Sequence, residues 1–181
     1  MKRTWPRFVA APLESRRLLL EPLQVEHAEE AVLVFDDERL HTYMGAAPAT
    51  FDQLRSRYAR QILGRSADGS EDWLNWIVRD RASGGIAGTV QSTVYHSGEH
   101  HDGIRLVAEV AWVVASPFQG QGVATEAAIM MRQWLQHGGV DVVIAHVHPE
   151  NLPSIGVATN LGLRPTTIMF DGELRWTSDP A

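Results

Sequence analysis

The sequence of 181 residues contains no cysteine. This absence excludes a disulfide framework, a thiolate metal site and a cysteine nucleophile, and it removes any sign of an oxidising compartment. Long apolar runs are missing as well. Basic residues open the chain at Lys2 and Arg3, but no stretch of signal-peptide or membrane-spanning length follows them. We therefore expect a cytoplasmic protein with no membrane partner, whose chemistry uses groups other than thiols.

Positive charge is in short supply, because 16 Lys and Arg residues face 22 Asp and Glu residues, for a net charge of −6. This balance argues against a nucleic-acid partner, since phosphate backbones are bound by clustered basic surface. A cationic or amine-bearing partner suits the negative field better. The length fits one domain, and 44% apolar with 21% charged residues is typical of soluble globular proteins. We expect a single domain over residues 1–181.

Hydrophobic periodicity predicts a mixed order of strands and helices. The expected strands are 16–21, 73–78, 85–95, 104–115, 140–148, 163–170 and 173–177, and the expected helices are 25–36, 51–63, 123–136 and 154–160. This order fits neither a doubly wound nucleotide fold nor an all-β sandwich, and it predicts an α/β (α+β) sheet layered by helices. The strand 104–115 is apolar on both faces, so we expect it to be central, with Glu109 as the one ionisable side chain in its core.

The most informative stretch is Gln119-Gly120-Gln121-Gly122-Val123-Ala124-Thr125, which leads from that strand into a helix. The first amides of a helix have no partner inside it, and the helix dipole adds partial positive charge there, so the stretch suits a phosphate or pyrophosphate. It has no lysine, as a P-loop requires, and it lacks the three spaced glycines of a dinucleotide fingerprint. On the glycines alone, an ordinary strand-to-helix turn explains it equally well.

Gln119-x-x-Gly122-x-Ala124 resembles the Gln/Arg-x-x-Gly-x-Gly/Ala signature of the GNAT superfamily of N-acetyltransferases. The longer stretch 118–127 is similar to the form found in the branch that acetylates the N-termini of ribosomal proteins. The residues 86–89, Ile-Ala-Gly-Thr, match the usual Ile-Gly-Thr hairpin strand of that family.

A second motif lies where the family needs it. Asn151-Leu-Pro-Ser154 and Asn160-Leu-Gly162-Leu163 are similar to the family's Asn-x-x-Ser and Lys-x-Gly-Phe, with Asn160 and Leu163 as departures. The resemblance extends over about 13–177. It implies a GNAT-like, mostly antiparallel central sheet of six to seven strands flanked by helices.

The resemblance also implies acetyl-CoA as cosubstrate and no metal. The cofactor-binding residues that it implies are Trp112, Val113, Val114, Gln119, Gly120, Gln121, Gly122, Val123, Ala124, Thr125 and Asn151. The amides of Gln119 to Thr125 would hold the pyrophosphate, Trp112 to Val114 would pair with the pantetheine arm as a strand would, and Asn151 would hydrogen-bond the same arm. By residue type, Asn151 fits a helix cap or a turn equally well.

Acetylation needs a neutral amine and a group that takes its proton. Deprotonation at neutral pH costs about 4 kcal/mol for a lysine amine but only about 1 kcal/mol for an α-amine, so an α-amine acceptor needs little basic help. Glu109 is the candidate base, since burial would tune its carboxyl group for proton transfer. A structural carboxylate in an ion pair is the alternative. His146 and His148 share one face of their strand and are further candidates, or merely polar residues on a half-exposed strand.

Departure of the CoA sulfur is helped in many family members by a tyrosine seven residues after the asparagine, where this chain has Ala158. Without that tyrosine, the leaving sulfur can be helped by Ser154 or by a water molecule, or it can leave directly as the thiolate. We assign Ser154 as the second candidate catalytic residue, although serine is also a common helix N-cap.

The loop between the central strands contains His96, His100, His101 and Asp102. Their spacing matches no standard ligand pattern, and such clusters are typical of solvated hairpin loops, so we expect no metal site. Because specificity usually lies in loops, the segments 41–51 and 95–104 are expected to shape the acceptor site.

The sequence therefore predicts an acetyl-CoA-dependent N-acetyltransferase that acts on a primary amine in a ternary complex. The acceptors that stay open are a protein N-terminus, a free amino acid, a polyamine and an aminoglycoside-like drug. A CoA-binding sensor domain without efficient turnover is the alternative, favoured by Ala158, and a nucleotide-phosphate enzyme is disfavoured by the missing lysine. Branch relatives are often dimeric, which makes a homodimer an open option.

Overall fold

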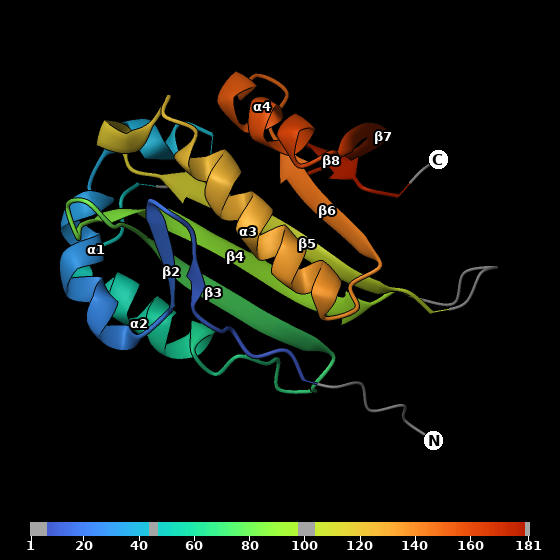
Figure 1. The fold of residues 1–181 in the computed structure, drawn as a ribbon, viewed down its shortest axis with the longest axis horizontal. Coiled ribbons are helices and arrows are strands. Elements are labelled where there is room, and N and C mark those ends of the chain that lie inside the picture. The colour runs from blue at the N-terminus through green and yellow to red at the C-terminus, as the bar shows by residue number, and fades with distance from the viewer. Residues whose placement is uncertain (1–6, 44–46, 98–103, 180–181) are drawn as a thin grey trace.

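A computed structural model describes residues 7–43, 47–97 and 104–179 (Figure 1). Within these residues, one sheet of eight strands carries four α-helices. The strands are β1 (Leu13–Glu14), β2 (Leu18–Pro22), β3 (Glu71–Asp80), β4 (Ile86–His96), β5 (Leu106–Val114), β6 (Val142–Val147), β7 (Arg164–Phe170) and β8 (Glu173–Thr177). The helices are α1 (Ala28–Val34), α2 (Phe51–Gln61), α3 (Val123–His137) and α4 (Leu152–Asn160), with short 3₁₀ turns at Val25–His27, Glu38–His41 and Ser116–Phe118.

The predicted element order and the mixed α/β class are confirmed. The sheet has eight strands where six to seven were expected, because β1 is only two residues long and offers no alternating pattern. It is held by its pairing with β2, in which Leu13 lies opposite Leu20. None of the helices that the structure describes is long and apolar enough to cross a membrane.

The strands lie in the order β1-β2-β3-β4-β5-β6-β8-β7, and all neighbours are antiparallel except β5 and β6. The strand β5 is central, as its two apolar faces predict. It pairs with β4 along its whole length, but with β6 only from Val107, opposite Val142, to Glu109, opposite Ile144. Beyond that point β6 continues beside β8. The sheet therefore divides, and among the described residues no strand lies beside one edge of β5 from 110 to 114.

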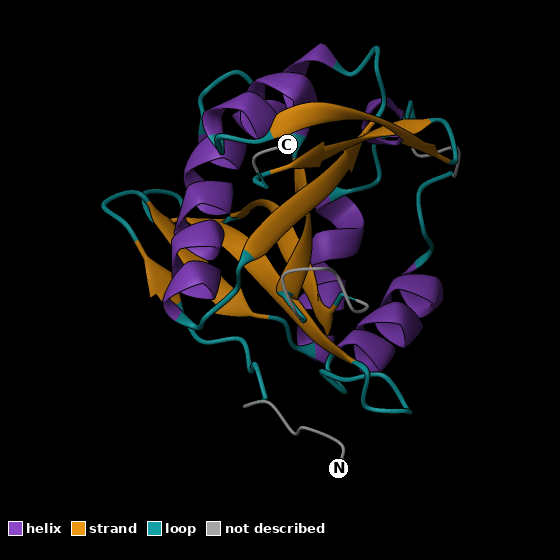
Figure 2. Cartoon of the chain, turned by 90° about the vertical axis from the view of Figure 1, so that its right-hand side faces the viewer, coloured by secondary structure: helices purple, strands orange, loops and turns teal. Residues whose placement is uncertain are grey.

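Helices cover both faces of the sheet. The helix α3 crosses one face, and α1 and α2 lie on the other side (Figure 2). Alternation along β3 shows the two layers: Trp76 belongs to the larger core beneath α3, and the next residue, Ile77, packs in a smaller core with α1 and α2. The helix α3 buries Val123, Ala127, Ala128, Met131 and Leu135, which recur at helical spacing.

The start of α2 is fixed by a capping box. The Gln53 amide donates to the Thr50 hydroxyl at 3.3 Å, and the Thr50 amide donates to the Gln53 side chain at 2.9 Å. Leu54 and Tyr58 face inward and are buried. Of the three polar residues between them, Arg57 lines the space between α2 and the sheet.

Candidate active site

A cavity of about 510 Å³ opens where β5 and β6 separate, on the face that carries α1 and α2. Its walls come from segments that are far apart in the sequence, from α1 to β8. Tyr43 and Ala49, from the segment expected to shape the acceptor site, line it. The other expected segment, 95–104, includes residues that lie outside those described. The polar lining residues include Arg57, Gln61, Gln91, Glu109, His146 and Glu173.

The loop before α3 presents open backbone donors. Gly120 and Gly122 have left-handed φ angles of 71° and 74°, which favour glycine. The first hydrogen bond of the helix runs from the Glu126 amide to the Gly122 carbonyl at 3.0 Å. The amides from Gly120 to Thr125 have no acceptor among the residues that the structure describes. This arrangement, at the N-terminus of a 15-residue helix, suits an anion.

Side chains brace the loop from outside. The Gln119 side chain donates to the Val114 carbonyl at 3.0 Å, and the Gln121 side chain donates to the Pro117 carbonyl at 2.8 Å. Arg17 donates to the Gln121 carbonyl at 2.9 Å and also pairs with Glu126. Partial burial of Glu126 is outweighed by hydrogen bonds from Ser15 and Arg17, so its pKa lies below its ordinary value. These contacts hold carbonyls and leave the loop amides exposed.

Trp112, Val113 and Val114 lie on the part of β5 that has left β6. Trp112 and Val113 line the cavity, while the Val114 carbonyl already accepts from Gln119. The unpaired edge of these residues can receive an extended amide-containing chain as a further strand would.

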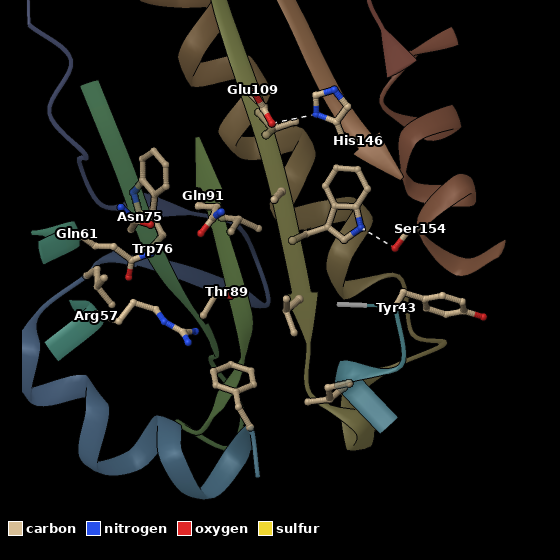
Figure 3. Close-up of a pocket in the computed structure, with 18 of the residues that line it drawn as sticks. Tyr43, Arg57, Gln61, Asn75, Trp76, Thr89, Gln91, Glu109, His146 and Ser154 are labelled. Atoms are coloured by element: carbon tan, nitrogen blue, oxygen red, sulfur yellow. Dashed lines mark hydrogen bonds and ion pairs between the residues drawn. The ribbon is translucent and has the colours of Figure 1, made fainter. Parts of the chain in front are cut away.

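Asn151 is the N-cap of α4, because its Oδ1 accepts from the Ser154 amide at 3.2 Å. Its side-chain amide nitrogen, Nδ2, has no acceptor in the described part of the chain and is free to donate toward the cavity that the residue lines. The capping alternative is therefore confirmed for Asn151, and not for Ser154. The Ser154 hydroxyl instead accepts from the Trp112 indole at 3.3 Å (Figure 3), which leaves its own proton available.

The expectation that Glu109 lies in the core is wrong. Its side chain is 44% exposed, and its Oε1 lies 3.0 Å from Nδ1 of His146, whose side chain is only 17% exposed (Figure 3). The predicted face of β5 is right, but that face is open to the cavity because the sheet divides there. A carboxylate beside Nδ1 favours the tautomer in which Nδ1 donates to it, and that tautomer leaves Nε2 as the acceptor.

The two histidines at the end of β6, His146 within the strand and His148 just after it, have different surroundings. His146 pairs with Glu109, and its ring lies 5.8 Å from that of Phe170. His148 follows the strand, accepts the Glu150 amide on Nδ1 at 3.2 Å and stacks at 5.1 Å on Tyr43. His146 therefore has a carboxylate partner, whereas His148 contacts the Glu150 amide of the following turn and the Tyr43 ring.

The sequence profile of the acetyltransferase (GNAT) domain matches residues 17–164. The chain belongs to the GNAT acetyltransferase family. Solved structures agree in fold. A GNAT acetyltransferase from Bacillus anthracis has a TM-score of 0.71 and 20% identity, and the match covers 92% of this chain and 97% of that one. A putative GNAT-family acetyltransferase from Bordetella pertussis has a TM-score of 0.68 and 26% identity, over 92% and 97%.

RimL, a ribosomal L7/L12 α-N-protein acetyltransferase solved in complex with coenzyme A, has a TM-score of 0.67 and 14% identity, over 93% of this chain and all of that one, 100%. No curated protein sequence matches the chain. Family membership makes this GNAT chain an acetyltransferase, an enzyme class that takes its acetyl group from acetyl-CoA.

Two residues of this acetyltransferase site are not predicted from the sequence: Arg57 on α2 and Glu173 on β8. The first has a usable signal, because a helical wheel of α2 places Arg57 beside the buried Leu54 and Tyr58. Burial raises the pKa of Tyr58 to about 12, so its phenol stays protonated, and burial also raises the pKa of Glu173 above its ordinary value.

Two further expectations concern the position of the missing tyrosine and the candidate metal loop. Ala158 is fully buried, at 0% exposure, in the larger core. His100, His101 and Asp102 of the candidate metal loop lie outside the described residues. Among those that are described, no three His, Cys, Asp or Glu side chains gather in a way that could hold a metal ion.

Proposed function

We propose that this acetyltransferase acts on a primary amine that binds together with acetyl-CoA, and that the Glu109–His146 pair receives the amine proton. The observation that carries the proposal is the 3.0 Å contact between these two side chains at the point where β5 and β6 part. A carboxylate behind an imidazole fixes its tautomer and stabilises the imidazolium that forms. The pair borders the cavity and the free edge of β5 together.

Acetyl-CoA fits the residues beside this pair. The open amides from Gly120 to Thr125 suit its pyrophosphate, the free edge of Trp112 to Val114 suits the amides of its pantetheine arm, and the Asn151 side-chain amide can donate to the same arm. When bound, acetyl-CoA supplies the acetyl group as a thioester.

The proton balance of the reaction follows from the site. A neutral amine forms the new C–N bond as the C–S bond of the thioester breaks, and one amine proton passes to Nε2 of His146. Glu109 stabilises the charge on the ring across the Nδ1 hydrogen bond. Holding the amine beside the thioester supplies much of the rate, since positioning replaces a bimolecular encounter.

Ser154 is the group proposed to help the sulfur leave. Its hydroxyl accepts from Trp112, and an accepted hydrogen bond strengthens the one that it can donate. Ala158 cannot take this role, since it has no polar atom and lies within the core.

Thermal unfolding with and without acetyl-CoA tests the proposal first. A ligand at about 100 times its Kd stabilises the folded state by about 2.7 kcal/mol, so a clear rise in Tm is expected with acetyl-CoA but not with ATP or NAD. Release of free CoA thiol then reports turnover on a panel of amines, and the chain itself adds no background because it has no cysteine.

The outcomes separate the alternatives. If Tm does not rise at saturating acetyl-CoA, the cofactor assignment is contradicted. The loop before α3 would then be only a structural turn. A rise in Tm without thiol release from any amine favours the sensor domain instead.

A further inference from the structure

The acceptor cavity has an arginine with no charged partner. Elsewhere, arginines pair with carboxylates: Arg79 with Glu21 and Glu30, and Arg81 with Glu14. Arg57 makes no ion pair or hydrogen bond with any residue that the structure describes. An exposed arginine without a partner is ordinary; Arg57 is exposed too, but it also lines the cavity.

The guanidinium of Arg57 reaches from α2 toward β4, across the space between helix and sheet (Figure 3). Among the described residues that line the larger cavity it is the one arginine, and none is a lysine. Beside it are the amide side chains of Gln61, Asn75 and Gln91, which line both this cavity and an adjoining one of about 370 Å³. A guanidinium only donates hydrogen bonds, and a side-chain amide can donate through its NH2 group, so this wall can bind an anion.

Acidic residues lie at the other end of the cavity. Glu109 and Glu173 come from β5 and β8, and a carboxylate is stabilised by a cation beside it. Burial raises the pKa of Glu173 above its ordinary value, and a nearby cation would oppose that shift. The cavity thus has a positive wall on α2 and a negative end beside His146, although the whole chain carries a net charge of −6.

We propose that Arg57 binds an anionic group on the acceptor, which is a small amine that also carries a carboxylate or a phosphate. The inference rests on the proposed function, because it places the amine at Glu109 and His146 and the anion at Arg57. A planar guanidinium matches either anion with two parallel hydrogen bonds. A polyamine or an aminoglycoside brings only positive charge to this wall and is disfavoured.

The test compares paired amines by the initial rate of CoA release. L-alanine is paired with L-alaninamide, and O-phosphoethanolamine with ethanolamine, with spermidine and kanamycin as the cationic arms. The enzyme should prefer the amine that carries the anionic group over the partner that lacks it, in at least one pair and by roughly 10- to 100-fold in kcat/KM, the range of a hydrogen-bonded charge. The pair that shows the preference distinguishes carboxylate from phosphate.

The variant Arg57→Gln should lose that preference while its Tm still rises with acetyl-CoA. Arg55→Gln is the matched control, because Arg55 lies on the same helix, is exposed, and lines neither cavity. Intrinsic amine reactivity differs within each pair, but it cancels when variants are compared. Arg57→Lys, which keeps the charge and loses the planar fork, should fall between wild type and Arg57→Gln, and it serves if Arg57→Gln does not fold.

An unchanged preference in Arg57→Gln overturns the inference. So does a wild-type enzyme that turns over the amines without an anionic group as well as, or better than, the amines that carry one. Stabilisation by acetyl-CoA without turnover of any anionic amine overturns it as well, while the cofactor assignment stands. Failure of acetyl-CoA to stabilise the wild type is different, because that result contradicts the proposed function itself.

Discussion

The loop before α3 and the cavity beside β5 are built in opposite ways. The loop is a run of consecutive residues, 119–125, whose donors are backbone amides. The cavity is assembled from side chains of α2, β4, β5, β6 and β8, with Arg57 and Glu173 more than a hundred residues apart. A backbone site tolerates most substitutions except at glycine, whereas a side-chain site can be lost by one change.

This difference separates binding from chemistry. Variants of the loop should change the affinity for acetyl-CoA, and variants of the cavity should change turnover with that affinity retained. Four sets of variants test the separation, from the largest expected effect to the smallest.

Loss of the proton acceptor should have the largest effect. His146→Gln is expected to lower kcat by about 10²- to 10³-fold, the range typical of general-base catalysis, and to leave the stabilisation by acetyl-CoA unchanged. Glu109→Gln, which keeps a hydrogen-bonding side chain but removes the charge, should cost less. His148→Gln is the control, since His148 is held by the Glu150 amide and Tyr43. Equal losses at both histidines, measured as kcat by thiol release, would contradict the assignment.

Gly122→Val tests the loop. Valine at the φ of 74° that Gly122 adopts costs about 1–2 kcal/mol and shifts the amides on either side, so the KM for acetyl-CoA should rise by about 10-fold or more. At saturating acetyl-CoA, kcat should stay within a few-fold of wild type, roughly, because the cavity is untouched. Gly139→Val carries similar strain at a φ of 97° outside the loop. If that variant raises the KM as much, strain alone explains the result.

The loop could be predicted from the sequence and the cavity could not, which follows the same contrast between consecutive and distant residues. The loop, the element order and the central place of β5 come from local patterns, since 119–125 and each strand carry their own signal. The Glu109–His146 pair does not, because it depends on where β5 and β6 part, a property of two strands and not of either. Periodicity placed Glu109 on the right face but could not tell that this face opens into a cavity. Arg57 was missed because a charge on a helix surface is ordinary until the opposite wall is known.

Ser154→Ala should have a smaller effect on turnover. Loss of the hydroxyl is expected to lower kcat by about 10-fold, since a thiolate is already a fair leaving group and one neutral hydrogen bond contributes about 1 kcal/mol. Trp112→Phe keeps the hydroxyl but removes its 3.3 Å indole donor, and it should cost less than Ser154→Ala. Rates that match wild type in Ser154→Ala would mean that the sulfur leaves without an acid from this residue.

The smallest effect is expected where a side chain braces the loop from outside. Glu126→Gln removes the partner of Arg17 and should lower the free energy of unfolding by about 0.5–1 kcal/mol at neutral pH, the range of partly exposed pairs. The pKa of Glu126 in the folded chain lies below its ordinary 4.5, so the unfolded chain binds the proton first as the pH falls. The difference between wild type and variant should therefore be full above pH 4.5 and shrink as the pH falls below it, in denaturant titrations. Glu29→Gln, on the exposed face of α1, should show no such trend. The loop amides make no hydrogen bond to Glu126, so the KM of Glu126→Gln for acetyl-CoA should stay near that of wild type. A large rise in this KM would mean that the Arg17–Glu126 pair is needed for the loop 119–125 to bind the anion.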